Sequence, residues 1–188
     1  IKGKHVNIGN PGSGQRGNSM DAMEACGIDP EKDLRAEGLK ADESAKMLQD
    51  NRIDAFFYTV GHPNGSIKEA TSGTRKVHFV PIEGSCIDQL LGKWPFYAKA
   101  MIPIKFYEQA SNKGDVPTFA VKATFCTSAK VPDNVVYAIT KELFENLEEF
   151  KGLHPAYEIL TKENMLEART APIHPGALRY YKEAGMIK

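Results

Sequence analysis

The sequence predicts an α/β protein built around a mostly parallel, doubly wound sheet. Short segments rich in apolar and β-branched residues, such as Val6–Gly9 and Ile53–Gly61, alternate with segments whose apolar residues recur at helical spacing. The connections are short, and parallel strands need a helix in each crossover. The chain has 188 residues, of which 41% are apolar and 26% charged, which is typical of a folded globular protein. A formal net charge of zero argues against nucleic acid as a partner.

Strands and helices are predicted in alternation up to about residue 92. Gly27 stops the first helix, and Ser66-Ile-Lys-Glu69 has the residues of a capping box that Gly73 closes. The segment Ile53–Gly61 is rich in aromatic and β-branched residues, which predicts a buried strand. In chain order we predict a strand at 6–9, helices at 18–26 and 42–51, a strand at 53–61, a helix at 66–73, a strand at 77–82 and a helix at 85–92.

The pattern changes near residue 93. Prolines interrupt the apolar segment 94–107, which confines it to edges and extended connections. We predict that Val116–Ser128 is a long strand passing between two lobes. A helix from Pro132 carries an apolar stripe, and we predict short helices at 157–160 and 163–168, a turn at 171–177 and a last helix at 178–184. The stripe consists of Val136, Ile139, Leu143, Leu147 and Phe150.

Cysteines and histidines give no sign of a metal site. Cys26, Cys86 and Cys126 are scattered and odd in number, so we predict neither a disulfide framework nor a zinc site and expect buried small apolar side chains. The histidines lack the spacing of metal ligands. We therefore predict no metal, no cofactor and no catalytic set. The histidines are His5, His62, His78, His154 and His174.

A glycine-rich turn follows the first predicted strand, with the sequence Gly12-Ser13-Gly14-Gln15-Arg16-Gly17. Glycines let backbone N–H groups approach a ligand closely. The helix that follows adds unpaired N–H donors and a positive dipole end. Arg16 can hold a carboxylate or phosphate through two parallel hydrogen bonds. We therefore predict a site for a small anion, formed by Gly12, Ser13, Gly14, Gln15 and Arg16.

The same turn matches the G-x-G-x-x-G pattern of dinucleotide-binding proteins, which leaves an NAD-dependent oxidoreductase as an alternative. Pro11 lies in the turn, however, and Gly9-Asn10-Pro11 lengthens the gap after the strand. Glu37 has roughly the spacing of the ribose-binding acid, but Leu34-Arg-Ala-Glu-Gly38 is a poor strand. A turn with a purely structural role is a second alternative.

A second candidate site follows the predicted strand 53–61, in the stretch Tyr58-Thr-Val-Gly-His62. Ligands bind at the carboxyl ends of strands in parallel sheets. Tyr58 and Thr59 can contact a ligand, Gly61 allows close approach, and His62 follows. The alternative is that Tyr58 belongs to the core and His62-Pro63 is only a turn.

Taken together, these stretches resemble the TAXI family, the substrate-binding subunits of tripartite ATP-independent periplasmic (TRAP) transporters. The resemblance covers essentially the whole chain. It rests on Val6-Asn-Ile-Gly-Asn-Pro-Gly-Ser-Gly-Gln-Arg16, Ile53-Asp-Ala-Phe-Phe-Tyr-Thr-Val-Gly-His-Pro63, Val116-Pro-Thr-Phe-Ala-Val121, Val131-Pro-Asp-Asn-Val-Val-Tyr-Ala-Ile-Thr140 and His174-Pro-Gly-Ala-Leu-Arg-Tyr-Tyr-Lys-Glu-Ala-Gly185.

The resemblance implies a type II periplasmic-binding-protein architecture with two α/β lobes around a cleft. Residues 1–116 would form the second lobe, and residues 117–188 the hinge strand and the C-terminal helical part of the first lobe. The family segment that normally precedes Ile1 is not part of this sequence. We expect a periplasmic protein without catalysis that captures a small carboxylate or amino acid, such as glutamate, and delivers it to membrane permease subunits.

The resemblance also distributes roles within the site. Ser13 and the N–H groups of Gly14 and Gln15 would hold the ligand carboxylate, and Arg16 would pair with it or with a second one. Tyr58, Thr59, Gly61 and His62 would line the opposite wall of the same lobe. A third hypothesis, besides a binding protein and an oxidoreductase, is an immunogenic or adhesive surface protein without a small-molecule ligand.

Overall fold

The computed structural model describes residues 1–167 and 170–187 and divides into two units, Ile1–Val121 and Lys122–Lys188. Both units contain helices, and the strands are in the first. The predicted mixed α/β class is therefore confirmed. Whether the units correspond to two lobes of a binding protein stays a prediction.

A three-stranded parallel sheet lies at the centre of the first unit. β1 (His5–Asn7) is the middle strand, with β2 (Arg35–Glu37) on one side and β3 (Ala55–Phe56) on the other. All pairings are parallel. The chain passes from β1 to β2 and then crosses to the opposite side of β1. The carboxyl end of β1 is therefore the point where the strand order reverses, which is the usual ligand position in such sheets.

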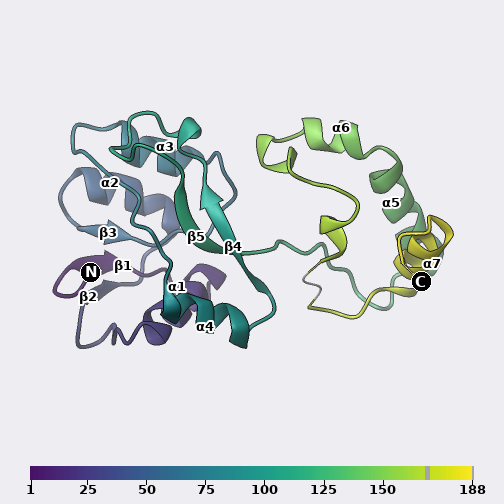
Figure 1. The fold of residues 1–188 in the computed structure, drawn as a ribbon, viewed down its shortest axis with the longest axis horizontal. Coiled ribbons are helices and arrows are strands. Elements are labelled where there is room, and N and C mark those ends of the chain that lie inside the picture. Colours follow the sequence, from purple (N-terminus) through teal and green to yellow (C-terminus); the bar gives the residue numbers. More distant parts are fainter. Residues whose placement is uncertain (168–169, 188) are drawn as a thin grey trace. The chain divides into compact units, whose positions relative to one another are not determined.

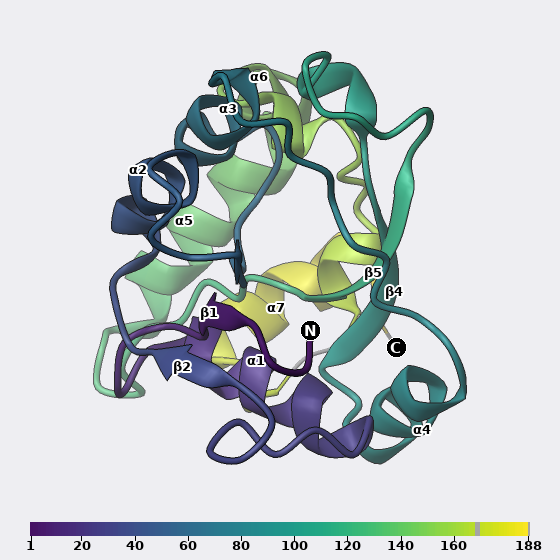
Figure 2. The same ribbon diagram turned by 90° about the vertical axis from the view of Figure 1, so that its left-hand side faces the viewer.

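Helices cover both faces of this sheet (Figures 1 and 2). On one face, α1 (Gly14–Ala25) contributes Met23 to a buried cluster with Val6 and Ile8. On the other face, α2 (Ser44–Gln49) and α3 (Gly65–Ser72) contribute buried apolar side chains. These side chains form a buried cluster with Ile53, which lies two residues before β3. The cluster consists of Ala45, Leu48, Ile53 and Ala70. Successive side chains of a strand point to opposite faces of the sheet, so each face offers apolar side chains for a helix to cover.

One polar side chain is fully buried at the carboxyl end of β1. Asn7 has no exposed surface, yet its carboxamide is fully hydrogen-bonded. Its Oδ1 accepts from the N–H groups of Gly9 (3.1 Å) and Leu39 (3.0 Å). Its Nδ2 donates to the Leu39 carbonyl (3.2 Å) and to Ser44 Oγ (2.8 Å). Asn7 thus joins the loop after β1 to the segment after β2 and to the start of α2.

A second, two-stranded sheet is antiparallel. β4 (Tyr97–Ile102) pairs with β5 (Val116–Val121), and the 3₁₀ turn Ile104–Phe106 lies between them in the chain. α4 (Ser85–Lys93) packs beside α1. A core cluster joins α1, α4 and β4 and consists of Ala22, Ile87, Leu90 and Tyr97.

A disulfide between Cys26 and Cys86 corrects the cysteine prediction. Cys26 caps the end of α1, and Cys86 lies in the first turn of α4. Because the two helices pack together, these ends approach to 5.1 Å between Cα atoms although 60 residues separate them in the chain. Spacing in the sequence does not reveal such a pair. None of the three cysteines is buried, and Cys126 is an exposed free thiol.

The strand predictions were too long. The segment 53–61 forms ladder pairs only at Ala55–Phe56, and 116–128 only at Val116–Val121. The segment 77–82 forms no strand, although Val77 and Phe79 are hydrogen-bonded to Ser111 and Asn112. Outside the ladders these segments form isolated backbone hydrogen bonds, such as Ile82 N–H to the Pro117 carbonyl of β5, so β-propensity alone overestimated the sheet.

Helices occur near the predicted positions, but their first residues differ from the prediction. α1 begins at Gly14 rather than at residue 18, since Ser13 caps it. The cap of α3 is Asn64, whose Oδ1 accepts from Ile67 N–H (3.1 Å), so Ser66 is not the capping residue. The predicted helix 42–51 is a 3₁₀ turn at Ala41–Glu43 followed by α2.

The second unit is mainly helical. α5 (Asp133–Glu145) packs against α7 (Pro175–Glu183), and α6 (Leu147–Gly152) follows α5. The helices are so close that a Cβ on Gly176 would lie 2.2 Å from the Asp133 carbonyl oxygen. The buried residues between them are Val136, Thr140, Phe144, Leu147, Ala177 and Tyr180.

The predicted apolar stripe of α5 is wrong at one position, since Ile139 is 47% exposed while Thr140 is buried. α7 begins at Pro175, inside the predicted turn, because His174 caps it through Nδ1. Short 3₁₀ turns replace the predicted helices, at Pro155–Tyr157 and Asn164–Leu166. The end of the predicted helix 163–168, Ala168, lies outside the described residues.

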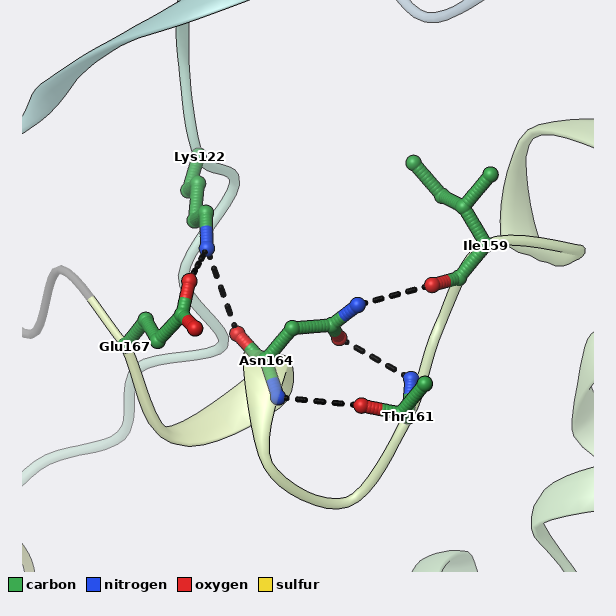
Figure 3. Close-up of polar contacts among 5 residues, drawn as sticks. All are labelled: Lys122, Ile159, Thr161, Asn164 and Glu167. Atoms are coloured by element: carbon green, nitrogen blue, oxygen red, sulfur yellow. Dashed lines mark hydrogen bonds and ion pairs between the residues drawn. The ribbon is translucent and has the colours of Figure 1, made fainter.

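Lys122, the first residue of the second unit, is tied to the later 3₁₀ turn (Figure 3). Its ammonium group donates to Glu167 and to the Asn164 carbonyl. The Asn164 side chain in turn bonds the Ile159 carbonyl (2.7 Å) and the Thr161 N–H (2.9 Å). The segment that follows β5 is therefore anchored at its first residue.

Removal of the Asn7 carboxamide should destabilise the first unit strongly. In Asn7→Ala, buried partners on Gly9, Leu39 and Ser44 lose their hydrogen bonds, so we expect a loss of about 2–4 kcal/mol in the free energy of unfolding. Urea denaturation followed by circular dichroism measures it. Asn10→Ala is the control, with a change below about 0.5 kcal/mol. Equal effects of the two substitutions would contradict the role of Asn7.

Reduction of the disulfide should also lower stability. Cys26→Ser with Cys86→Ser opens a long loop, and we expect a loss of about 2–4 kcal/mol. Urea unfolding of the oxidised protein with and without a reductant gives the same comparison in the wild type. Cys126→Ser is the control, and its reductant-dependent loss should equal that of the wild type. A wild-type midpoint that is insensitive to reductant would be evidence against the bond.

Candidate functional site

The loop after β1 is held tightly against the first turn of α1. Gly9 has a φ of +97°, and a Cβ there would lie 3.0 Å from the Arg16 backbone nitrogen. No larger residue fits without a shift of the helix. Ser13 caps α1: its Oγ accepts from Arg16 N–H (3.1 Å) and donates to the Asn10 carbonyl (2.8 Å). The Ser13 hydroxyl hydrogen is therefore engaged within the turn.

Two backbone donors remain at the start of α1. The Arg16 and Gly17 N–H groups are bonded to Ser13, but those of Gly14 and Gln15 have no partner in the part of the chain that the structure describes. The first turn also contains no acidic residue that would offset the positive end of the helix. The predicted anion turn thus has free N–H groups at Gly14 and Gln15.

The first turns of α1 contact the segment that continues β3. Gln15 Nε2 donates to the Phe57 carbonyl (2.8 Å), and Asn18 Nδ2 donates to Thr59 Oγ1 (3.0 Å). The structure therefore brings Gln15 and Thr59, two of the predicted site residues, to neighbouring positions. Because Asn18 supplies the hydrogen of its contact, the Thr59 hydroxyl hydrogen is free to donate elsewhere.

Asn18 and Tyr97 were not predicted as part of this region. The Tyr97 hydroxyl approaches Asn18 Oδ1 (3.0 Å) and Asp21 Oδ2 (2.6 Å). Burial, and then the hydrogen bond to the Asp21 carboxylate, raise the pKa of Tyr97. The hydroxyl therefore stays protonated and links the second sheet to α1. The i, i+3 spacing of Asn18 and Asp21 could have indicated a shared helix face, but nothing in the sequence indicated Tyr97 as their partner.

Arg16 points away from this contact. Its Nη1 donates to the Gly9 carbonyl (3.1 Å) and lies beside Gly38, just after β2. β2 and β3 flank β1 on opposite sides. The structure thus separates the Arg16 side chain from the Phe57–Thr59 segment, whereas the sequence placed Arg16 and Tyr58 around one ligand. Tyr58 itself is half-buried and has no hydrogen-bond partner among the described residues.

His62 is fixed by a buried tyrosine. The Tyr107 hydroxyl accepts from the Asn64 backbone N–H (3.0 Å) and lies 2.7 Å from His62 Nδ1. This hydrogen bond fixes the orientation of the His62 ring and leaves Nε2 without a partner among the described residues. Burial lowers the pKa of His62. Tyr107 is only 2% exposed, which makes it a rigid support. Gly61, just before the cis peptide His62–Pro63, is exposed.

A family model described as the NMT1-like family matches residues 1–185. The chain belongs to the NMT1-like family. This family is periplasmic-binding-protein-like. Membership indicates an extracytoplasmic solute-binding protein with a small-molecule ligand and transporter partners.

Two structural findings accompany the family assignment. Among the residues that the structure describes, no helix is long and apolar enough to cross a membrane. Nor does this part of the chain hold a group of three or more His, Cys, Asp or Glu side chains placed to bind a metal ion.

The glycine pattern does not act as a dinucleotide fingerprint here. Gly17 is helical, and a Cβ on it would meet nothing within 4 Å, so close helix–strand packing does not require this glycine. Glu37 does end a strand, which corrects the sequence prediction. Its carboxylate, however, pairs with His5 Nε2 at 2.6 Å. Nothing in the NMT1-like family assignment supports the oxidoreductase alternative.

His62 should make stability depend on pH. Its folded-state pKa is lowered from 6.5, so the unfolded chain binds the proton more readily. The free energy of unfolding should therefore fall as the pH drops below about 6.5. We expect His62→Gln to weaken this decline in urea titrations between about pH 7.5 and about pH 5. The exposed His78, changed to Gln, is the control and should keep the wild-type decline. An unchanged decline in His62→Gln would contradict the burial of a neutral ring.

Proposed function

We propose that this NMT1-like protein captures a small carboxylate or amino acid, of the glutamate type, as the TAXI-family binding subunit of a TRAP transporter. The observation that carries the proposal is the pair of unpartnered N–H groups of Gly14 and Gln15 at the positive end of α1. They lie at the carboxyl end of β1, where the strand order reverses.

The β3 side supplies the remaining groups of the proposed site. The Thr59 hydroxyl is a free donor that suits a carboxylate or an amide oxygen of the ligand, and His62 has its Nε2 free for a further hydrogen bond. Tyr58 adds an aromatic surface and Gly61 a position without a side chain. Gly12 and Ser13 shape the turn, and Ser13 acts through its cap rather than through a free hydroxyl. Arg16 adds positive charge near the turn.

The disulfide supports an extracytoplasmic location. Disulfides form and persist in oxidising compartments such as the periplasm. The bond between Cys26 and Cys86 fastens the end of α1, the helix whose start forms the proposed anion site. We further propose that residues 1–116 are the second lobe of a binding protein, and that residues 117–188 supply its hinge strand and the C-terminal part of the first lobe.

A proline substitution tests the backbone donors without disturbing the helix. Gly14 is the first helical residue, where proline is well tolerated, and Ser13 before it is already extended (φ −82°, ψ 147°). Gly14→Pro removes one N–H donor, whereas Gly14→Ala retains it. A Cβ at this position meets nothing within 4 Å.

We expect calorimetric titration with L-glutamate to show at least about tenfold weaker binding for Gly14→Pro, because one charge-assisted hydrogen bond is lost. Gly14→Ala should bind as the wild type does. Circular dichroism of both variants checks that α1 is intact. Equal affinities for the two variants would show that the Gly14 N–H group does not bind the ligand. Lack of binding to L-glutamate, succinate and acetate by the wild type would overturn the proposed ligand class.

A further inference from the structure

A hollow of about 350 Å³ lies on the opposite side of α1 from the proposed anion site. This volume is at the lower end of the range for small-molecule pockets. The hollow is bounded by α1, by the end of β1, by β2 and by the turn that precedes β2. The residues that line it are Ile8, Arg16, Met20, Pro30, Glu31, Leu34 and Ala36.

Five of the seven residues that line the hollow have apolar side chains. Ile8 and Leu34 belong to the buried core cluster on this face of the sheet, and Met20 packs against it. Ile8 is 1% exposed and Leu34 is 9% exposed, so most of the apolar surface open to a ligand belongs to the other apolar residues of the lining, Met20, Pro30 and Ala36. Burial of aliphatic groups against these side chains is favourable by about 0.8 kcal/mol per CH₂.

The wall of the hollow carries charge in a defined place. Arg16 is half-buried, and only its Nη1 has a partner, the Gly9 carbonyl. Its other N–H donors have no partner among the described residues and are available to a carboxylate. Glu31 is exposed, and its carboxylate has no hydrogen-bond or ion-pair partner among those residues. It disfavours a second negative charge on a ligand.

We propose that this hollow is a second binding site, which takes a small monocarboxylate with an aliphatic body. The acid group pairs with Arg16, and the chain lies against Met20, Pro30 and Ala36. The site goes beyond the proposed capture of a glutamate-like ligand, because it uses the β2 side of α1 and neither of the free N–H groups of Gly14 and Gln15.

Methyl NMR spectroscopy with hexanoate as the probe tests the proposal. We expect saturable shifts of the Ile8, Met20 and Leu34 methyl signals in the millimolar range. 1-Hexanol has a similar chain without the carboxylate, so it should produce much weaker shifts. Absence of saturation with hexanoate, or equal shifts with 1-hexanol, would overturn the proposal.

Three variants test whether hexanoate binding depends on the charge of Arg16 and on the space in the hollow. Arg16→Gln should weaken hexanoate binding at least about fivefold, because the ion pair is lost. Arg35→Gln makes the same charge change at an exposed position of β2, one residue from the hollow, and should bind as the wild type does. Ala36→Leu should abolish hexanoate binding by filling the hollow. It provides an independent test of the site if Arg16→Gln does not fold. Equal affinities of Arg16→Gln and Arg35→Gln, or retained binding in Ala36→Leu, would contradict the proposal.

The two proposed sites fail independently. Gly14→Pro should leave hexanoate binding unchanged, because the hollow uses neither of the free N–H groups of Gly14 and Gln15. Loss of hexanoate binding in Gly14→Pro would show that the hollow is not a separate site. Normal hexanoate binding without any glutamate effect would support the hollow and overturn only the proposed function.

Discussion

The carboxamide of Asn7 is the interaction on which the geometry of the first unit depends. It is fully buried, and its four hydrogen bonds connect the loop after β1, the segment after β2 and the start of α2. An unsatisfied amide in this position would be costly, so the three segments must hold their places together. Gly9 is fixed by this contact, and Gly9 in turn allows the first turn of α1 to approach the strand.

Different sides of α1 carry different functional groups of this unit. Gln15 and Asn18 contact the segment after β3, which contains Thr59. Arg16 and Met20 line the hollow beside β2. At the other end, Cys26 joins the helix covalently to α4. A single helix thus separates two environments, one with free backbone donors and one with apolar side chains and a guanidinium group.

The sequence predicted the parts of the structure that local signals encode. Alternation of strands and helices gave the α/β class, and the glycines after Val6–Gly9 gave the turn and its helix. The lengths of strands were not predictable, because pairing at 77–82 depends on partners elsewhere in the chain. The Cys26–Cys86 bond was missed for a similar reason: it results from the packing of α1 on α4.

Side-chain direction limited the prediction of the site more than residue choice did. Arg16 was identified as a charged residue near the turn, but a helix turns by about 100° per residue, so Gln15 and Arg16 face different strands. The supporting residues Asn18, Tyr97 and Tyr107 were missed. Their contacts join positions 41 to 79 residues apart, which no local pattern records.

The anchoring of α1 at both ends bears on how this protein would bind. Its first turns are held by Ser13, Gln15 and Asn18, and its C-terminal capping residue, Cys26, is held by a covalent bond. The Gly14 and Gln15 donors are thus arranged before any solute arrives, so little conformational entropy is lost when they are used. Such preorganisation favours fast capture without local rearrangement, and it places the control of residence time in the groups that close over the solute afterwards.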